Sequence, residues 1–183
     1  MRATLRVFQA LCACSIVAVT ALARPAPPPP DSPLWVSILG EEETVDGLWR
    51  GHDVLAGSDH VVDRFQVSLR PDAAVLVELE AVTADGVQRL YPKGATSGRL
   101  EPGQSYSLPG PRTFFEVRGE ARLRLRVRPA DATGSQQARL RPLGSAQAVR
   151  YPLSDGSAAS VLEQSFAIVR GATAELEWQM HGR

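Results

Sequence analysis

Arginine occupies every second position over one short stretch of the chain. The four residues, which we call the arginine ladder, are Arg122, Arg124, Arg126 and Arg128, and apolar residues fill the positions between them. In a β-strand the ladder projects from one face while the apolar residues enter the core. The planar guanidinium group matches carboxylate and phosphate. The pattern therefore makes the ladder a candidate binding site for an anionic envelope polymer or a lipid headgroup.

A second interpretation gives the same arginines a structural role. Glutamates alternate in the same way in two other segments, at Glu78 and Glu80 and at Glu175 and Glu177. Neighbouring strands would then place opposite charges side by side, and each exposed ion pair contributes about 0.2–1 kcal/mol. We favour this interpretation, because the acidic segments have the same period as the ladder. Alternating glutamates of this kind are also more typical of the solvent-exposed face of a strand than of the paired carboxylates of a glycosidase site.

Five potential metal ligands cluster in one polar stretch of the sequence. They are His52, Asp53, Asp59, His60 and Asp63. Imidazole and carboxylate groups bind zinc and similar ions, and such a site would make the protein a small metal-assisted hydrolase. The spacing matches no known metal motif, however, and the surrounding GHDVLAGSDH is typical of a polar loop with solvated histidines. We therefore expect no bound metal and no cofactor.

Other chemistry finds little support in the sequence. There is no G-x-S-x-G nucleophile motif, no HExxH or CxxC pattern and no glycine-rich phosphate loop. The 20 basic residues balance the 20 acidic ones, which removes the positive charge that nucleic-acid binding needs. We expect neither a catalytic residue nor a nucleic-acid partner.

Residues 1–23 have the pattern of an export signal. Arg2 and Arg6 make a positive region, residues 11–22 are largely apolar, and small residues at 21 and 23 form a cleavage pattern. Cleavage after Ala23 predicts a periplasmic or secreted protein.

Both cysteines of the chain, Cys12 and Cys14, lie inside this signal, so the mature protein has no thiol or disulfide chemistry. Two alternatives remain open. Residues 11–14 resemble a lipobox, in which a lipidated Cys14 becomes the first residue of a membrane-anchored lipoprotein, and an uncleaved signal would also hold the protein at the membrane. We expect membrane contact only through one of these two anchors.

A proline-rich segment over residues 24–33 follows the signal. Such a composition favours polyproline II and makes a semi-rigid spacer. About 150 residues then remain, a common size for one domain. We expect residues 34–183 to form that single domain.

Period-two alternation predicts strands through the rest of the chain. The Asp85-Gly86 pair suits a tight turn, so we expect a hairpin over residues 74–91. The other strands that we expect cover residues 65–69, 113–118, 121–128, 161–170 and 174–180, with a bend at Gly119. Gly171-Ala172 joins the last two strands as a terminal hairpin, and residues 41–55 have room for a short helical turn. The pattern indicates an all-β fold, a single antiparallel β-sandwich, immunoglobulin-like or related, preceded by the signal helix and the spacer.

We expect one aromatic residue in the core and two others at the surface. Trp178 is in phase with Leu176 and Met180, which favours the core. Trp49 and Tyr91 are candidates for a ligand-contact edge, where amphipathic rings serve well.

The turn residues of the central region have a familiar order. It runs through Asp85-Gly86, Leu90-Tyr91-Pro92, Leu100 with Pro102-Gly103, Leu108-Pro109, Phe115-x-Val117 and Gly119-Glu120. Over residues 60–130 this resembles the bacterial family called domain of unknown function 4384. The resemblance implies a compact, mostly β accessory domain with no assigned catalytic residue, of a kind found beside peptidases, kinases and envelope proteins.

These observations favour an exported, non-catalytic accessory or binding module of the bacterial cell envelope. We expect its partner to be a protein or an envelope polymer. Two alternatives stay open. One is the metal-assisted hydrolase with His52 and His60, and the other is a structural subunit of an envelope complex.

Overall fold

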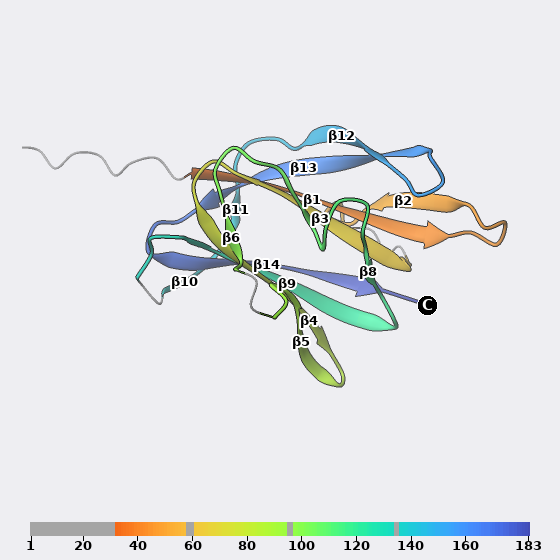
Figure 1. Cartoon of the computed structure of the whole chain (residues 1–183), viewed down its shortest axis with the longest axis horizontal. Helices are drawn as coiled ribbons and strands as arrows, with labels where there is room; N and C mark the ends of the chain where they lie inside the picture. The colour runs from red at the N-terminus through yellow and green to blue at the C-terminus, as the bar shows by residue number, and fades with distance from the viewer. Residues whose placement is uncertain (1–31, 58–60, 95–96, 134–135) are drawn as a thin grey trace, which may run out of the picture.

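Strands and turns make up the structure, and the described residues contain no helix. The structure is a computed structural model that describes residues 32–57, 61–94, 97–133 and 136–183. The strands form two sheets, one of eight strands and one of six. In Figure 1, β1, β12 and β13 lie above β4, β9 and β14, so the two sheets are seen as two layers. The expected all-β class is confirmed.

The first sheet has β1 at its centre, between β13 on one side and β3 on the other. Two further pairs extend it, β2 with the second half of β1 and β12 with the first half of β13. Its strands are β1 (Ser32–Glu43), β2 (Trp49–Asp53), β3 (Arg64–Pro71), β7 (Tyr106–Leu108), β8 (Phe115–Glu116), β11 (Arg141–Pro142), β12 (Gln147–Pro152) and β13 (Ala158–Ile168).

The second sheet has the order β10-β14-β9-β4-β5, with β6 also beside β4. Its strands are β4 (Val75–Thr83), β5 (Gly86–Tyr91), β6 (Arg99–Leu100), β9 (Glu120–Pro129), β10 (Gln136–Arg139) and β14 (Ala172–His181). The ladder strand β9 therefore lies between two strands that carry glutamates. This arrangement decides the surroundings of the arginines.

The main core is built from both sheets. Alternate residues of β1 and β3 pack against alternate residues of β4 and β9 in one cluster of buried side chains. Its fully buried members include Leu34, Ile38, Val77 and Leu125. The period-two pattern of the sequence thus correctly identifies the residues of β4 and β9 that face inward.

The hairpin expected over residues 74–91 is confirmed. Its strands β4 and β5 pair from Leu79 opposite Tyr91 to Thr83 opposite Gly86. The last pair is Thr83 opposite Gly86, so the two-residue loop is Ala84-Asp85, one position earlier than the Asp-Gly pair indicates. Gly86 takes a φ of 127°, a conformation that glycine adopts freely and other residues avoid. The bend at Gly119 is also confirmed, between β8 and β9.

The expected terminal hairpin is wrong. The last two strands, β13 and β14, belong to different sheets, where β13 pairs with β1 and β14 pairs with β9. The chain turns at 169–172, where the N–H of Ala172 donates to the carbonyl of Val169, and crosses from one layer to the other. Both strands still point their apolar faces at the shared core. Alternation specifies which face of a strand is buried, but it does not specify which strand pairs beside it.

Two further expectations need correction. The pairing is not purely antiparallel, because β10 and β14 run parallel, a pairing that requires the long crossover through β11, β12 and β13. Residues 41–53 form a β-hairpin instead of a helical turn, with Glu41 of β1 opposite Gly51 of β2, and residues 54–57 form a turn. Pairing with β1 satisfies the backbone of this segment, which has no helical period of its own.

The N-terminal expectations concern residues outside the described ones. The signal over residues 1–23, its lipobox alternative at Cys14 and most of the spacer over 24–33 lie there. The described part begins with β1 at Ser32, so the last two residues of the expected spacer belong to a strand.

Candidate functional site

The arginine ladder faces glutamates on both sides. β9 lies between β4 and β14, and its residues alternate between the core and the outer face of the second sheet. Arg124 stands opposite Glu80 of β4 and Glu177 of β14. Arg126 stands in the same way opposite Glu78 and Glu175.

The two central arginines form close ion pairs with these glutamates. The Nε of Arg124 donates to Oε1 of Glu177 at 2.7 Å, and the Nε of Arg126 donates to Oε1 of Glu175 at 2.7 Å. The Nη1 of Arg126 also lies 3.2 Å from Oε2 of Glu80, whose side chain is 9% exposed. The hydrogen bond from Arg124 lowers the pKa of Glu177 below its ordinary value. Cross-strand pairing is therefore confirmed for Arg124 and Arg126.

The outer ladder residues, Arg122 and Arg128, are exposed. Neither of them forms an ion pair with another residue of the described ranges. Arg122 stands opposite Val82, which carries no charge. Arg128 lines a groove of about 400 Å³ on the outer face, together with Arg126 and the two acids Glu78 and Glu175. Two positive and two negative charges cancel there, so the groove does not concentrate charge for an anion.

His52 is buried rather than solvated, contrary to the expectation from its polar surroundings. It lies in β2, its exposure is 8%, and its Nε2 is 3.2 Å from Oε2 of Glu42 on β1. That hydrogen bond is the main reason why the pKa of Glu42 lies below its ordinary value, and Arg183 adds a second hydrogen bond to the same carboxylate. Glu42 is therefore held between two donors at the end of the first sheet.

Asp53 is directed differently from His52, because neighbouring residues of a strand point to opposite faces. Its carboxylate accepts hydrogen bonds from the N–H groups of Leu55 and Leu162, which fixes the turn after β2 against β13. Asp63 accepts from the N–H of Glu43. The candidate ligands Asp59 and His60 lie outside the described residues, and among those that the structure describes no three acidic, histidine or cysteine side chains gather in a metal-binding group.

A buried carboxylate that the sequence analysis missed lies on the outer face of the first sheet. Glu41 has an exposure of 0%, and its Oε2 accepts from Arg64 at 2.6–2.7 Å and from the hydroxyl of Ser154 at 3.1 Å. The guanidinium carbon of Arg64 lies 3.3 Å from the ring centroid of Trp49 and 4.7 Å from that of Phe114. We call these five residues the Glu41 cluster.

The Glu41 cluster continues a small second core. Leu39, Leu153 and Val161 are buried there, on the face of β1 that points away from the main core. Trp49 stacks on Arg64 and also lines an open pocket beside β2, and Tyr91 packs against the main core, where burial raises its pKa. A ligand-contact role for these two residues stays a prediction. Both faces of β1 are covered, which explains why its sequence does not alternate cleanly. The full burial of Glu41 assigns the cluster to stability, since a solute does not reach the carboxylate.

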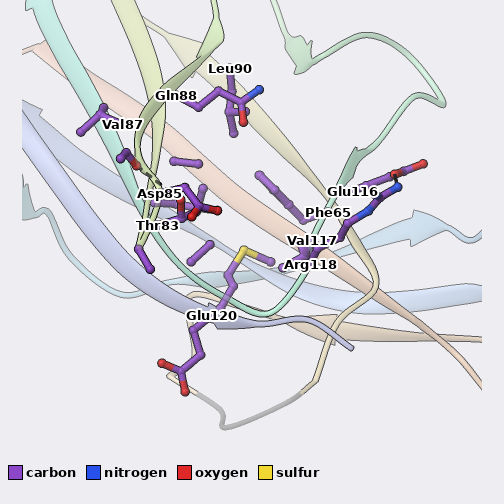
Figure 2. Close-up of a pocket in the computed structure, with 16 residues that line it drawn as sticks. Phe65, Thr83, Asp85, Val87, Gln88, Leu90, Glu116, Val117, Arg118 and Glu120 are labelled. Atoms are coloured by element: carbon purple, nitrogen blue, oxygen red, sulfur yellow. Dashed lines mark hydrogen bonds and ion pairs between the residues drawn. The ribbon is translucent and has the colours of Figure 1, made fainter.

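An open cavity of about 750 Å³ lies at one end of the second sheet, and we call it the end cavity. Figure 2 shows Thr83, Asp85 and Gln88 of the β4–β5 hairpin on one side and Glu116, Val117 and Arg118 on the other. Buried apolar side chains line its floor: Phe65, Ala81, Val117, Leu123 and Met180. Its rim is exposed and polar: Asp85, Gln88, Glu116, Arg118 and Glu120.

Small side chains account for the space. Where β4, β9 and the hairpin loop border the end cavity, they carry Ala81, Thr83, Ala84 and Ala121. At this end the β4–β5 hairpin also reaches away from β1 and β13 (Figure 1). An apolar floor with a polar rim is the usual composition of a ligand site. No single motif marks it in the sequence, because its residues come from four separate stretches of the chain.

Comparison with known proteins adds no relative: no family model, no curated protein and no solved structure matches the chain. In the part of the chain that the structure describes, no helix has the length and apolar character needed to cross a membrane.

Proposed function

We propose that the protein is an exported, non-catalytic binding module of the bacterial cell envelope that takes an apolar group of its partner into the end cavity. The observation that carries this proposal is the composition of the cavity, with a floor of buried apolar side chains under a rim of exposed polar ones. The accessory role implied by the family resemblance is part of the same proposal.

The finer description of the fold belongs to this proposal as well. The two sheets share one core, which supports a β-sandwich related to the immunoglobulin type and a single domain over residues 34–183. In such sandwiches the ends of the sheets carry the binding loops. The end cavity has that position, between the β4–β5 loop and the connection from β8 to β9.

Small probes test the end cavity directly. Benzylamine supplies an apolar ring with a positive charge, and benzoate supplies the same ring with a negative charge. We expect benzylamine to shift the methyl NMR signals of Val117, Leu123 and Met180, which line the cavity, with an affinity in the millimolar range of about 1–10 mM typical of weak fragments. Benzoate should shift them less, because three carboxylates and one guanidinium make the rim acidic.

A matched pair of tryptophan variants locates the effect. Ala121→Trp fills the cavity from β9, whereas Ala148→Trp adds the same ring to the exposed strand β12 of the other sheet. We expect the first variant to lose the benzylamine shifts and the second to retain them. Equal shifts in both variants, or shifts at methyl groups throughout the core, would show that the cavity is not the binding site.

Export and chemistry have separate tests. Mass spectrometry of the protein recovered from cells should give Arg24 as the first residue, whereas a lipidated Cys14 would identify the anchored form. Metal analysis of untagged protein tests the alternative hydrolase, because zinc that disappears in His60→Ala would support it. Stable co-purification with an envelope complex would favour a structural subunit.

A further inference from the structure

We propose that the partner engages the end cavity as an extended basic polypeptide segment that adds to the second sheet beside β5. This inference rests on the proposed function and names the partner class of the same site. It goes further in one respect, because it assigns the backbone of β5 as part of the binding surface.

β5 forms an edge of the second sheet. It pairs with β4 on one side and has no strand on the other among the residues that the structure describes. Alternate N–H and C=O groups of such a strand point away from its neighbour and are free to pair with another chain. Residues 86–89 are all exposed, and Val87 has an exposure of 63%.

The side chains of β5 connect this edge to the cavity. Gln88 stands opposite Ala81, which stands opposite Leu123 on β9, so the three residues form a row across the inner face of the sheet. All three line the end cavity, and Leu90 lines it one step further along β5. A strand added beside β5 would continue this row and point every second side chain toward the cavity.

The outer face of β5 favours the same arrangement. Arg89 points to the opposite face from Gln88, and its Nη2 lies 3.7 Å from Oε1 of Glu78. Its charge is therefore directed toward the glutamates of the outer face and away from the cavity. Charged side chains commonly protect exposed edges from pairing, and this edge carries only that one.

The charge of the rim selects the partner. Asp85, Glu116 and Glu120 carry three negative charges against one positive charge on Arg118. Arg118 is already within 3.1 Å of Glu116. Glu120 makes a longer contact, 3.8 Å from Nδ1 of His181, and its side chain is 82% exposed, so it remains accessible to a cation together with Asp85. The matching occupant is an extended segment with apolar residues at alternate positions and lysine or arginine at its ends.

Calorimetric titration of the whole protein with the peptide Ac-KVTLTVK-NH2 tests this proposal. We expect binding that weakens as NaCl rises, and weaker binding of the isomer Ac-KVLTTVK-NH2, which has the same composition without the alternation. The acidic peptide Ac-EVTLTVE-NH2 should bind more weakly still. Equal affinity for all three peptides would contradict both the alternation and the charge requirement.

N-methylation separates strand addition from simple insertion of side chains. Only one set of alternate peptide N–H groups can face β5, so methylating that set should reduce the affinity about tenfold or more, while methylating the other set should have little effect. If neither set matters but benzylamine still binds in the cavity, strand addition is wrong and the proposed function stands. If benzylamine also fails, the proposed function itself is wrong.

Two charge variants identify the edge. Gln88→Lys places a positive charge on β5, and Gln137→Lys places the same charge on β10 at the opposite edge of the sheet. Both residues are exposed, so both variants should keep the far-ultraviolet spectrum of the native protein. We expect only Gln88→Lys to weaken peptide binding. A loss in Gln137→Lys alone would place the peptide on β10, and a dimer of the free protein that Gln88→Lys dissociates would make a second copy the occupant; either result overturns the proposal.

Discussion

Arg64 and Glu41 form an ion pair across neighbouring strands in which the carboxylate is fully buried and the guanidinium contacts the rings of Trp49 and Phe114. The two residues are register partners of β3 and β1. On the other side of Glu41 stands Gly51 of β2, where a Cβ atom would collide with Ala159 and Leu153. The pair is thus enclosed by the second small core.

Loss of Arg64 should destabilise the protein strongly. Arg64→Ala leaves the buried charge of Glu41 without its partner, which typically costs about 3–5 kcal/mol in the free energy of unfolding. Urea unfolding measures the change. The matched control is Arg118→Ala, whose ion pair with Glu116 joins side chains that are 86% and 76% exposed, and it should stay within about 1 kcal/mol. Equal effects of the two variants would mean that Glu41 adapts to the loss.

Within the arginine ladder, position should decide the effect of a substitution. Arg126→Ser removes the nearer of the two arginines that pair with the nearly buried Glu80 and should cost about 1–3 kcal/mol in unfolding free energy. Arg122→Ser removes a side chain that forms no ion pair with any described residue, and it should change stability by about 0.5 kcal/mol or less. Thermal unfolding of the two variants is the measurement. A larger loss for Arg122 would argue against cross-strand pairing as the role of the ladder.

The anion-binding interpretation of the ladder has its own test. The double variant Arg122→Ser and Arg128→Ser removes the two exposed guanidinium groups and leaves the ion pairs of Arg124 and Arg126 in place. We expect it to elute from immobilised heparin at the same salt concentration as the native protein, because the glutamates balance the charge of this face. Elution at clearly lower salt would support an anionic partner.

Stability should fall in acid, in part through Glu42. Its folded pKa lies below the ordinary value of 4.5, chiefly because of the hydrogen bond with His52. A lowered carboxylate pKa contributes stability that is complete above the unfolded value and is lost as the pH falls through the folded value. Glu42→Gln should therefore be less stable than the native protein at about pH 7, and the difference should shrink toward about pH 3. A difference that stays constant with pH would exclude this linkage.

Gly98 should tolerate no side chain. A Cβ at this position would overlap the backbone carbonyl of Val77, whose N–H donates a hydrogen bond to the carbonyl of Gly98. Because backbone atoms cannot move aside cheaply, Gly98→Ala should cost about 1–3 kcal/mol. At Gly110 the nearest atom would be 3.6 Å away, so Gly110→Ala should be nearly neutral. Unfolding midpoints in urea compare the two, and equal midpoints would contradict the close approach.

The local features of the fold follow from short-range patterns in the sequence. Alternation identified β3, β4 and β9 and the faces that they bury, and Asp85-Gly86 and Gly119 marked two of the turns. It also predicted that the ladder arginines and the alternating glutamates would pair, as Arg124 does with Glu177. These features are readable because a strand has a period of two and a turn has few permitted residues.

Other features depend on contacts between distant parts of the chain. The sequence did not reveal that β13 and β14 lie in different sheets, since both strands keep their apolar faces toward the core in either arrangement. It did not distinguish Glu41 from its exposed neighbour Glu43, because the burial of Glu41 depends on residues as distant as Ser154. The end cavity likewise arises where separate segments meet. Contacts between residues far apart in the chain determine these features, so a local sequence pattern does not predict them.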